Sequence, residues 1–385
     1  MHSFGLLKFH SPSHTLCYPF HWAEVRMDIV HKLADSVYAS TGLSLPLLET
    51  AGGCAERGRV CSGACDRASS LLPESLVGQR EPARVISDAV CDHWSAVPAP
   101  ERPLAIAVHG PPGVGKSFAH RLLARAAFNA SSASCPGPGC RAYRSLFATD
   151  YAQANETEHA LRIKQSLEHH LRRFPAGIIA LEEYDRAGCN LRGLLRHLLD
   201  SGVAGSAAAP RSVIVLEANT GWGVASSIAN GTLPGEKASL TGANGALKSL
   251  MHRAWKAEHC GETSVDTQRL ISLISNFVPF FPLDFDSVRE LCERNLRERR
   301  AALLANDGTQ LSWDRAVPDR MADQVEYTNG FAAEGASSAR RADRFVSRAV
   351  RSVQADVMAR AERQPDALRL QVERGNIVAR VGDVA

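Results

Sequence analysis

Long apolar runs are missing from this chain of 385 residues, and none approaches the roughly 20 residues that a helix needs to cross a bilayer. His, Ser and Pro interrupt the first 30 residues throughout, so no continuous apolar core of a signal peptide is visible there. The sequence therefore predicts neither a membrane-spanning helix nor a recognisable signal peptide.

A strong excess of charge of one sign is also missing. Lys and Arg number 44 and Asp and Glu number 41, which leaves a net charge of +3. This balance argues neither for nor against nucleic acid, and we expect no nucleic-acid partner. The apolar content of 45% and charged content of 22% are ordinary for a globular protein. The length suggests two domains, or one domain with an appendage, and we find no internal repeat.

One glycine-rich motif is specific. It matches the phosphate-loop pattern G-x-x-x-x-G-K-[ST] at every fixed position, and its residues are Gly110, Pro111, Pro112, Gly113, Val114, Gly115, Lys116 and Ser117. A short apolar run at 104–108 predicts a buried strand before it, and 118–128 predicts a helix after it. A strand that turns through glycines into a helix points backbone amides at one spot, which binds phosphate. Lys116 would reach the β- and γ-phosphates, and the Ser117 hydroxyl would ligate Mg²⁺.

The rest of the chain alternates between strand and helix patterns up to residue 283. Apolar segments predict further strands at 145–148, 177–181, 213–216 and 277–283, with helices over 158–173 and 191–199 between them. This alternation predicts an α/β fold with a parallel sheet covered on both faces. The glycine-rich segments 201–210 and 221–246 are interpreted as loops.

Beyond residue 284 the pattern becomes helical only, with helices expected over 286–304 and 338–360. The sequence therefore predicts four parts. They are an irregular cysteine-containing leader over 1–70, a large nucleotide-binding domain over 71–283, a helical lid over 284–350 and a C-terminal helical extension over 351–385.

Two adjacent acids, Glu182 and Glu183, follow the second apolar strand, where the Walker B acids of a nucleotide hydrolase belong. The usual pair is Asp-Glu. Glu182 takes the Asp position and would meet the Mg²⁺ shell through water, while Glu183 would act as the general base. The alternative is two solvated acids at the end of a strand.

Asn219 lies just beyond the strand predicted at 213–216. An uncharged amide at that strand tip could hydrogen-bond the attacking water and the γ-phosphate. An isolated Asn near a Gly is also common as a simple turn residue.

The order of these motifs resembles the Clp branch of the AAA+ superfamily, and within it the torsin family. The resemblance includes the segment Leu76-Val77-Gly78-Gln79 and the stretch Phe-Val-Pro-Phe-Phe-Pro-Leu over 277–283, and it covers about residues 54–345. It implies an AAA+ large α/β domain followed by a small all-helical lid, with ATP and Mg²⁺ as ligands. It also implies nucleotide contacts at Val77 and Gly78 and a role for Asn219 as the residue called sensor 1.

The resemblance further implies a place and partners. Torsins act in the lumen of the endoplasmic reticulum and in the nuclear envelope, where they remodel protein partners. They lack the arginine finger of other Clp proteins, and Leu273 stands at that position here. We therefore expect a weak ATPase that needs a membrane-anchored activator to supply the arginine, with homo- or hetero-oligomers possible.

The chain departs from the torsin pattern at two places, and it also lacks the aromatic pore loop with which Clp unfoldases grip substrate. Torsins carry Asn where Ser117 stands, which favours ordinary Mg²⁺ ligation here. Torsins carry Gly-Cys-Lys at the site called sensor 2, where this chain has Gly335-Ala336-Ser337. Arg340 or Arg341, about one turn later, could substitute for the missing lysine; the alternative is a solvated basic face. Tyr151 is the only aromatic residue over 150–173, so we expect no aromatic pore loop and no threading of substrate.

Ten cysteines are many for a cytosolic chain of this size. Cys54, Cys61 and Cys65 offer three thiols with no nearby His, whereas a zinc site needs four ligands. Disulfides are the better interpretation. Glycosylation sequons at Asn129, Asn155 and Asn230 weakly favour a secretory compartment.

Two other functions stay open at this point. One is a nucleotide-gated binding or assembly module with negligible hydrolysis, which the missing finger and the Glu at the Walker B Asp position favour. The other is a Clp-type chaperone ATPase of the cytosol. The sequence names neither the client, nor the activator, nor the disulfide pairing.

Overall fold

The computed structural model describes residues 54, 59–129, 140–148, 156–186, 189–200, 210–230, 240–258, 260–261, 263–359 and 365–381. Most of the predicted leader, together with Asn155 and Tyr151, lies outside the described residues. Helix α2 (Ala64–Ser75) begins inside the segment that we expected to be irregular. It forms there because Ala64, Ala68 and Leu72 recur at a spacing of four and are all buried.

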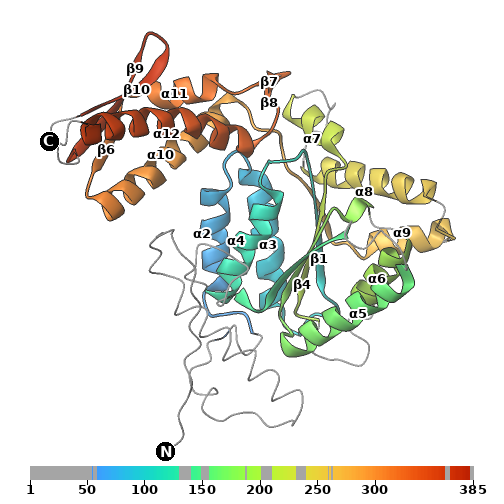
Figure 1. Cartoon of the computed structure of the whole chain (residues 1–385). Helices are drawn as coiled ribbons and strands as arrows, with labels where there is room; N and C mark the ends of the chain where they lie inside the picture. The colour runs from blue at the N-terminus through green and yellow to red at the C-terminus, as the bar shows by residue number, and fades with distance from the viewer. Residues whose placement is uncertain are drawn as a thin grey trace, which may run out of the picture. The chain divides into compact units, whose positions relative to one another are not determined.

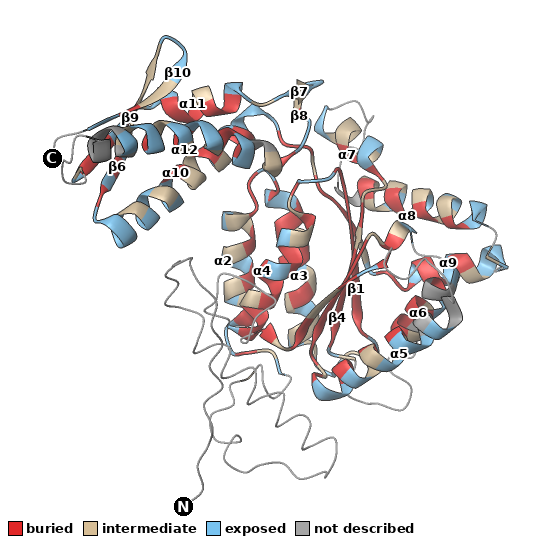
Figure 2. Cartoon of the chain, viewed as in Figure 1, coloured by how far each residue is buried: buried red, intermediate tan, exposed pale blue. Residues whose placement is uncertain are grey.

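The core of the large domain is a parallel sheet of five strands in the order β2-β3-β4-β1-β5 (Figure 1). The strands are β1 (Leu104–His109), β2 (Tyr143–Phe147), β3 (Ile178–Glu182), β4 (Val213–Ala218) and β5 (Asn276–Pro279). Every residue of β1 and of β3 is buried, as expected for strands covered on both faces (Figure 2). The predicted α/β fold with a parallel, helix-flanked sheet is confirmed.

Helices cover both faces of this sheet. Helix α3 (Arg80–Ser95) packs with α2 and α4 (Lys116–Phe128) on one face. The other face is covered by α5 (Glu156–Arg173), α6 (Cys189–Asp200), α8 (Leu240–Ala257) and α9 (Ser264–Ser272). Alternate residues of β1 enter the two cores: Ile106 and Val108 the first, Ala105 and Ala107 the second.

The prediction of a continuous loop over 221–246 is wrong. Helix α7 (Trp222–Ala229) and the first turns of α8 lie within it. The glycine content misled us there. Ala243 and Leu247 of α8, four residues apart, are both fully buried, and tertiary packing outweighs the low helix propensity of the glycines.

The lid contains α10 (Phe285–Asp307), α11 (Ala316–Asp323) and α12 (Ala336–Ala359). It is not all-helical, because β6 (Gln310–Trp313) joins a second sheet and the short strands β7 (Tyr327–Thr328) and β8 (Phe331–Ala332) form a ribbon. The buried cluster that includes α2 and α3 continues through Val288 and Leu296 of α10 to Val346 of α12.

The prediction of a C-terminal helical extension over 351–385 is confirmed for residues 351–359, which belong to α12, and is wrong for the described residues 365–381. Strands β9 (Ala367–Glu373) and β10 (Asn376–Val381) form an antiparallel hairpin, and β9 pairs in parallel with β6. Leu368 and Leu370 are buried at a spacing of two, which is the period of a half-buried strand. Arg374 and Gly375 both have positive φ, 49° and 78°, as a two-residue hairpin turn requires.

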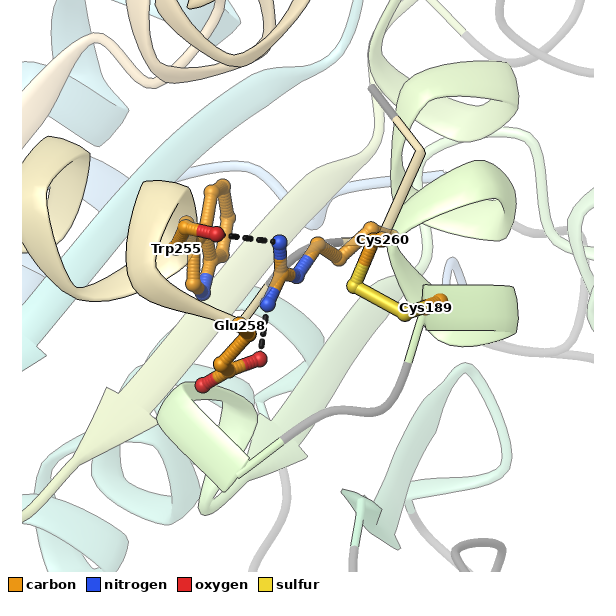
Figure 3. Close-up of a disulfide and its surroundings, with 5 residues drawn as sticks. Cys189, Trp255, Glu258 and Cys260 are labelled. Atoms are coloured by element: carbon orange, nitrogen blue, oxygen red, sulfur yellow. Dashed lines mark hydrogen bonds and ion pairs between the residues drawn. A yellow bond between two sulfur atoms is a disulfide. The ribbon is translucent and has the colours of Figure 1, made fainter. Parts of the chain in front are cut away.

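Disulfides join two pairs of the described cysteines, Cys54 with Cys61 and Cys189 with Cys260. The interpretation of the first cluster as disulfide-forming is confirmed, and the zinc alternative is wrong because two of its three thiols are used. Figure 3 shows the second bridge, which ties the start of α6 to the segment after α8. Beside it the buried Arg192 donates to the Trp255 carbonyl at 2.9 Å and to the Glu258 carboxylate (Figure 3). Across the described residues, no helix combines the length and the apolar character that crossing a bilayer demands.

Candidate functional site

The phosphate loop connects β1 to α4, as predicted. Gly113 and Gly115 have φ values of 77° and 102°, which side-chain-bearing residues rarely adopt. The loop is also packed tightly, because a Cβ on Gly110 would lie 2.4 Å from the Phe280 carbonyl oxygen. The backbone conformation therefore favours glycine at positions 113 and 115, and the lack of space for a side chain favours glycine at position 110.

Lys116 is almost entirely buried at the start of α4. Its Nζ donates to the carbonyls of Gly110 at 3.0 Å and Pro111 at 2.9 Å, and to Asn219 Oδ1 at 2.9 Å. Burial lowers its pKa, and the charges of Glu217, Asp185 and Glu183 oppose that shift. The structure thus brings two predicted residues, Lys116 and Asn219, into direct contact across 103 positions of sequence.

Ser117 is bound to a residue that sequence reasoning missed. Its Oγ donates to Glu217 Oε2 at 2.8 Å, and Glu217 Oε1 lies 3.9 Å from Lys116 Nζ. Burial alone would raise the pKa of Glu217, but the neighbouring His120, Ser117 and Lys116 hold it below its usual value. One signal could have found it: Glu217 interrupts an apolar strand and precedes Asn219 by two residues, so both lie on one side of β4.

Glu182 is the last residue of β3 and is 5% exposed. It accepts a short hydrogen bond from Ser145 Oγ of the neighbouring strand β2. Its Oε1 lies 3.8 Å from His120 Nε2, which itself lies 3.4 Å from Glu217 Oε2. The two predicted Mg²⁺ ligands therefore lie near Glu217. Ser117 contacts Glu217 directly, whereas Glu182 is linked to it through His120.

Glu183 follows immediately but points elsewhere. Its φ of 57° is unusual for a residue other than Gly, and its carboxylate lies 3.7 Å from Arg186 Nη1. Its side chain is about one-third exposed, at 31%. The predicted general base thus lies at the strand tip, near enough to influence the pKa of Lys116 but paired with an arginine.

A buried hydrogen-bond network joins the tips of β1, β3 and β4. Asp185 accepts from the Thr220 backbone N–H at 3.0 Å and from its hydroxyl. His109 Nδ1 lies 2.9 Å from the Thr220 carbonyl, which can only accept, so Nδ1 donates and Nε2 accepts from the Tyr184 hydroxyl at 2.7 Å. Burial lowers the pKa of His109 to about 4, so the ring stays neutral near pH 7. Because the network anchors Thr220, it also restricts the position of the preceding residue, Asn219.

A cavity of about 480 Å³ lies between the phosphate loop and the lid. It is lined by loop residues 113–117 and by Leu76, Val77, Leu283, Leu291, Arg294, Ala339 and Arg340, among others. Its volume falls in the usual range for small-molecule sites. Gly78, a predicted nucleotide contact, lines a neighbouring cavity instead, and Gly110, Pro111 and Pro112 do not line this one.

The lid touches the loop directly at the start of α12. The Ala336 amide donates to the Gly113 carbonyl at 2.7 Å, and a Cβ on Gly335 would lie 2.6 Å from Gly113. Of the two arginines considered for sensor 2, Arg340 lines the cavity, whereas Arg341 pairs with Glu334.

Leu273, at the expected position of an arginine finger, is 7% exposed at the end of α9. Arg269, one turn earlier, is exposed. A buried leucine cannot present a cation to a neighbouring subunit, so this position offers no finger.

Comparisons with known proteins agree with this architecture. A family model described as Torsin matches residues 53–170. The chain is 25% identical over 238 residues to a torsin-like protein of Caenorhabditis elegans, covering 60% of this chain and 64% of that one. It is 24% identical over 262 residues to a torsin-like protein of Drosophila melanogaster, covering 65% and 75%.

A bacterial relative is also similar. The chaperone protein ClpB of Rhodopirellula baltica is 25% identical over 288 residues, which make up 70% of this chain but only 29% of that protein. The chain therefore spans less than two thirds of both the ClpB and the Caenorhabditis elegans relatives. The family match over residues 53–170, the torsin-like relatives and the helix-flanked parallel sheet lead to one conclusion: the chain is similar to torsins and has an α/β fold consistent with AAA+ proteins.

Proposed function

We propose that this protein is an ATPase that binds ATP with Mg²⁺ between its large domain and its lid and remodels protein partners. One observation carries the proposal. Lys116, Ser117 and Asn219 converge with the buried Glu182 and the partly buried Glu217 at the carboxyl ends of β1, β3 and β4, beside a cavity of about 480 Å³. Ligands of open α/β sheets bind at that edge.

The loop and Lys116 would hold the phosphates. Lys116 Nζ now donates to two loop carbonyls, and it would exchange these for oxygens of the β- and γ-phosphates. Leu76, Val77, Leu283 and Ala339 form an apolar part of the cavity suited to the adenine ring. Arg340 would approach the phosphates from the lid.

The residues present fit Mg²⁺. Ser117 lines the phosphate end of the cavity, and Glu182 is linked to Glu217 through His120; Ser117 and Glu182 both offer oxygen atoms, which is the ligand chemistry that Mg²⁺ prefers. When bound, the ion supplies positive charge to the β- and γ-phosphate oxygens. Asn219 would position the attacking water, and Glu183 would accept its proton after separating from Arg186.

Activation would require a partner. Because Leu273 is buried, the missing cation would come from another protein, and such a finger can raise turnover by about 10³–10⁵. We propose a membrane-anchored activator in the lumen of the endoplasmic reticulum or the nuclear envelope, and assembly into homo- or hetero-oligomers. The disulfide between Cys189 and Cys260 supports an oxidising compartment.

A second function is favoured by the position of Glu183. Its carboxylate lies 3.7 Å from Arg186 and its backbone is in the left-handed region, so in this conformation an arginine competes for the carboxylate that would act as base. A protein held in this state would bind ATP to set a conformation or an assembly, with negligible hydrolysis.

Turnover separates the two functions. The wild type should bind ATP with Mg²⁺ and hydrolyse it slowly, and Glu183→Gln should bind equally well but lose turnover by about 10²–10⁴. Arg186→Ala, which frees Glu183, should not reduce the basal rate. Absence of turnover in wild type and Arg186→Ala, alone and with candidate activators, supports the assembly module instead.

A further inference from the structure

His120 is a buried imidazole next to the phosphate loop that the proposed function does not use. It lies on α4 one turn after Lys116 and is 1% exposed. Its Nδ1 lies 2.8 Å from the Tyr143 hydroxyl, and the two rings stack with centroids 5.8 Å apart. These contacts fix the direction of the ring.

The other ring nitrogen points at two carboxylates. Nε2 lies 3.4 Å from Glu217 Oε2 and 3.8 Å from Glu182 Oε1. It is buried and makes no well-formed hydrogen bond with the described residues. One ligand atom from each of the three residues lies within 4.8 Å of the other two.

This spacing suits a metal ion. Two ligand atoms that each lie about 2.1 Å from an ion, at tetrahedral or octahedral angles, are about 3.0–3.4 Å apart. The separations from Nε2 to the two carboxylate oxygens meet this range or exceed it by a few tenths of an ångström. Small rotations of the carboxylates close the difference.

The donor set selects the kind of ion. Mg²⁺ takes oxygen ligands and keeps much of its water, whereas an imidazole suits first-row transition metals and zinc. We propose that His120, Glu182 and Glu217 bind a divalent transition-metal or zinc ion without any nucleotide. The site adjoins the proposed nucleotide site and shares Glu182 with it, but it does not require that the chain bind ATP.

Each ligand is held by a further residue. With its proton on Nδ1, His120 donates to the Tyr143 oxygen and directs the Nε2 lone pair at the carboxylates. Ser145 donates to Glu182 and Ser117 donates to Glu217. Such outer contacts orient metal ligands in known sites and lower the cost of assembling them.

Mn²⁺ is a suitable probe because its electron paramagnetic resonance distinguishes free from bound ion and reports a nitrogen ligand. Titrated without nucleotide, the wild type should bind one equivalent of Mn²⁺ and show coupling to an imidazole nitrogen. Mg²⁺ in about 100-fold excess should leave most of it bound, as the preference for a nitrogen ligand predicts.

His120→Asn is the sharpest variant. The Asn amide can occupy the place of Nδ1 and keep the Tyr143 contact, but it offers no atom at the place of Nε2. Mn²⁺ affinity should fall at least about tenfold, the nitrogen coupling should disappear, and Mg²⁺ should now compete. Glu217→Gln tests the same site from β4, and His169→Asn, at an exposed histidine of α5, is the matched control with no expected change.

The results separate this proposal from the proposed function. If the wild type binds no Mn²⁺ without nucleotide, or binds it with no nitrogen coupling, the proposal is overturned, and His120 is only an ion partner of Glu217. ATP binding measured on the same samples can survive that result. Conversely, nucleotide-free Mn²⁺ binding without any ATP binding would support the metal site and contradict the proposed function.

Discussion

The phosphate side of the cavity and its lid side are held in different ways. On the phosphate side, Lys116 is buried and Glu217 is 12% exposed, and contacts between α4 and the end of β4 hold both side chains. On the lid side, Arg340 is exposed, and its only hydrogen bond among the described residues is a 3.4 Å contact with Ser337. The groups on the phosphate side are therefore held in place by contacts between elements, while the lid side has an exposed arginine and one tight backbone contact at Gly113.

The two domains also differ in what stabilises them. The large domain contains a disulfide over 71 residues and two buried histidines with strongly lowered pKa values. The lid and the tail, from residue 284 onward, contain no histidine, and their one cysteine, Cys292, is free. Acid and reductant should thus act on the large domain first.

The largest loss of stability and of ATP affinity is expected at Gly113, where the phosphate loop contacts the lid. In Gly113→Ala the new Cβ would lie 2.5 Å from the Glu334 carbonyl, at a φ of 77°. We expect a loss of about 2–4 kcal/mol in unfolding free energy from clash plus strain, and ATP affinity lower by at least about tenfold. Denaturant unfolding and nucleotide titration measure both.

Gly308→Ala is the matched control, because Gly308 has a φ of 68° but nothing within 4 Å of the added Cβ. It should cost only the strain, about 1–2 kcal/mol, and leave ATP affinity unchanged. If both variants lost the same unfolding free energy and the same ATP affinity, the phosphate loop would not depend on its contact with the lid.

Removing the disulfide should destabilise the large domain alone. Cys189→Ser opens the bridge to Cys260, and we expect the unfolding free energy to fall by about 2–5 kcal/mol. Cys65→Ser, at a free and half-buried thiol, should have little effect. Hydrogen exchange should become faster in α6 and stay unchanged in α10 and α12. Equally faster exchange in all three helices would contradict the claim that the disulfide stabilises the large domain alone.

Acid should act with the same selectivity. Burial lowers the pKa values of His109 and His170 to about 4, below the usual 6.5. Between these values the unfolded chain binds more protons than the folded one, so stability falls as pH drops from about 6.5 towards 4. The slope should be on the order of 1 kcal/mol per pH unit for each histidine. Denaturation at a series of pH values tests this, and His170→Gln should flatten the slope.

The smallest effect concerns the lid arginines. Arg340→Ala should weaken ATP binding about three- to tenfold, because an exposed charge contributes on the order of 1 kcal/mol. Arg341→Ala should do less, since Arg341 already pairs with Glu334. The reverse ranking in a nucleotide titration would assign the sensor-2 role to Arg341.

Local patterns in the sequence predicted the phosphate loop and the strand that precedes it well. Glycine spacing and one short apolar run determine that geometry, with no need for distant residues. The same holds for Asn219 and Glu182, which follow recognisable strands. These residues could be found because each motif carries its own structural context.

The structure was needed wherever contacts cross between elements. His120 and Glu217 come together only through the β3-β4-β1 order, and neither belongs to a sequence motif. The hairpin of β9 and β10 was missed because the arginines were interpreted as a solvated surface, although Leu368-Arg369-Leu370 has the alternation of a half-buried strand. The choice between Arg340 and Arg341 depended on which side of α12 faces the cavity.

ATP binding tests the central claim most directly. Isothermal titration with Mg²⁺–ATP should show one site per chain in the wild type. Lys116→Ala should abolish it, and Lys164→Ala, at a partly exposed lysine of α5, should leave it unchanged. A wild type that takes up no ATP, or a Lys116→Ala variant that binds it with the same affinity, would contradict the account.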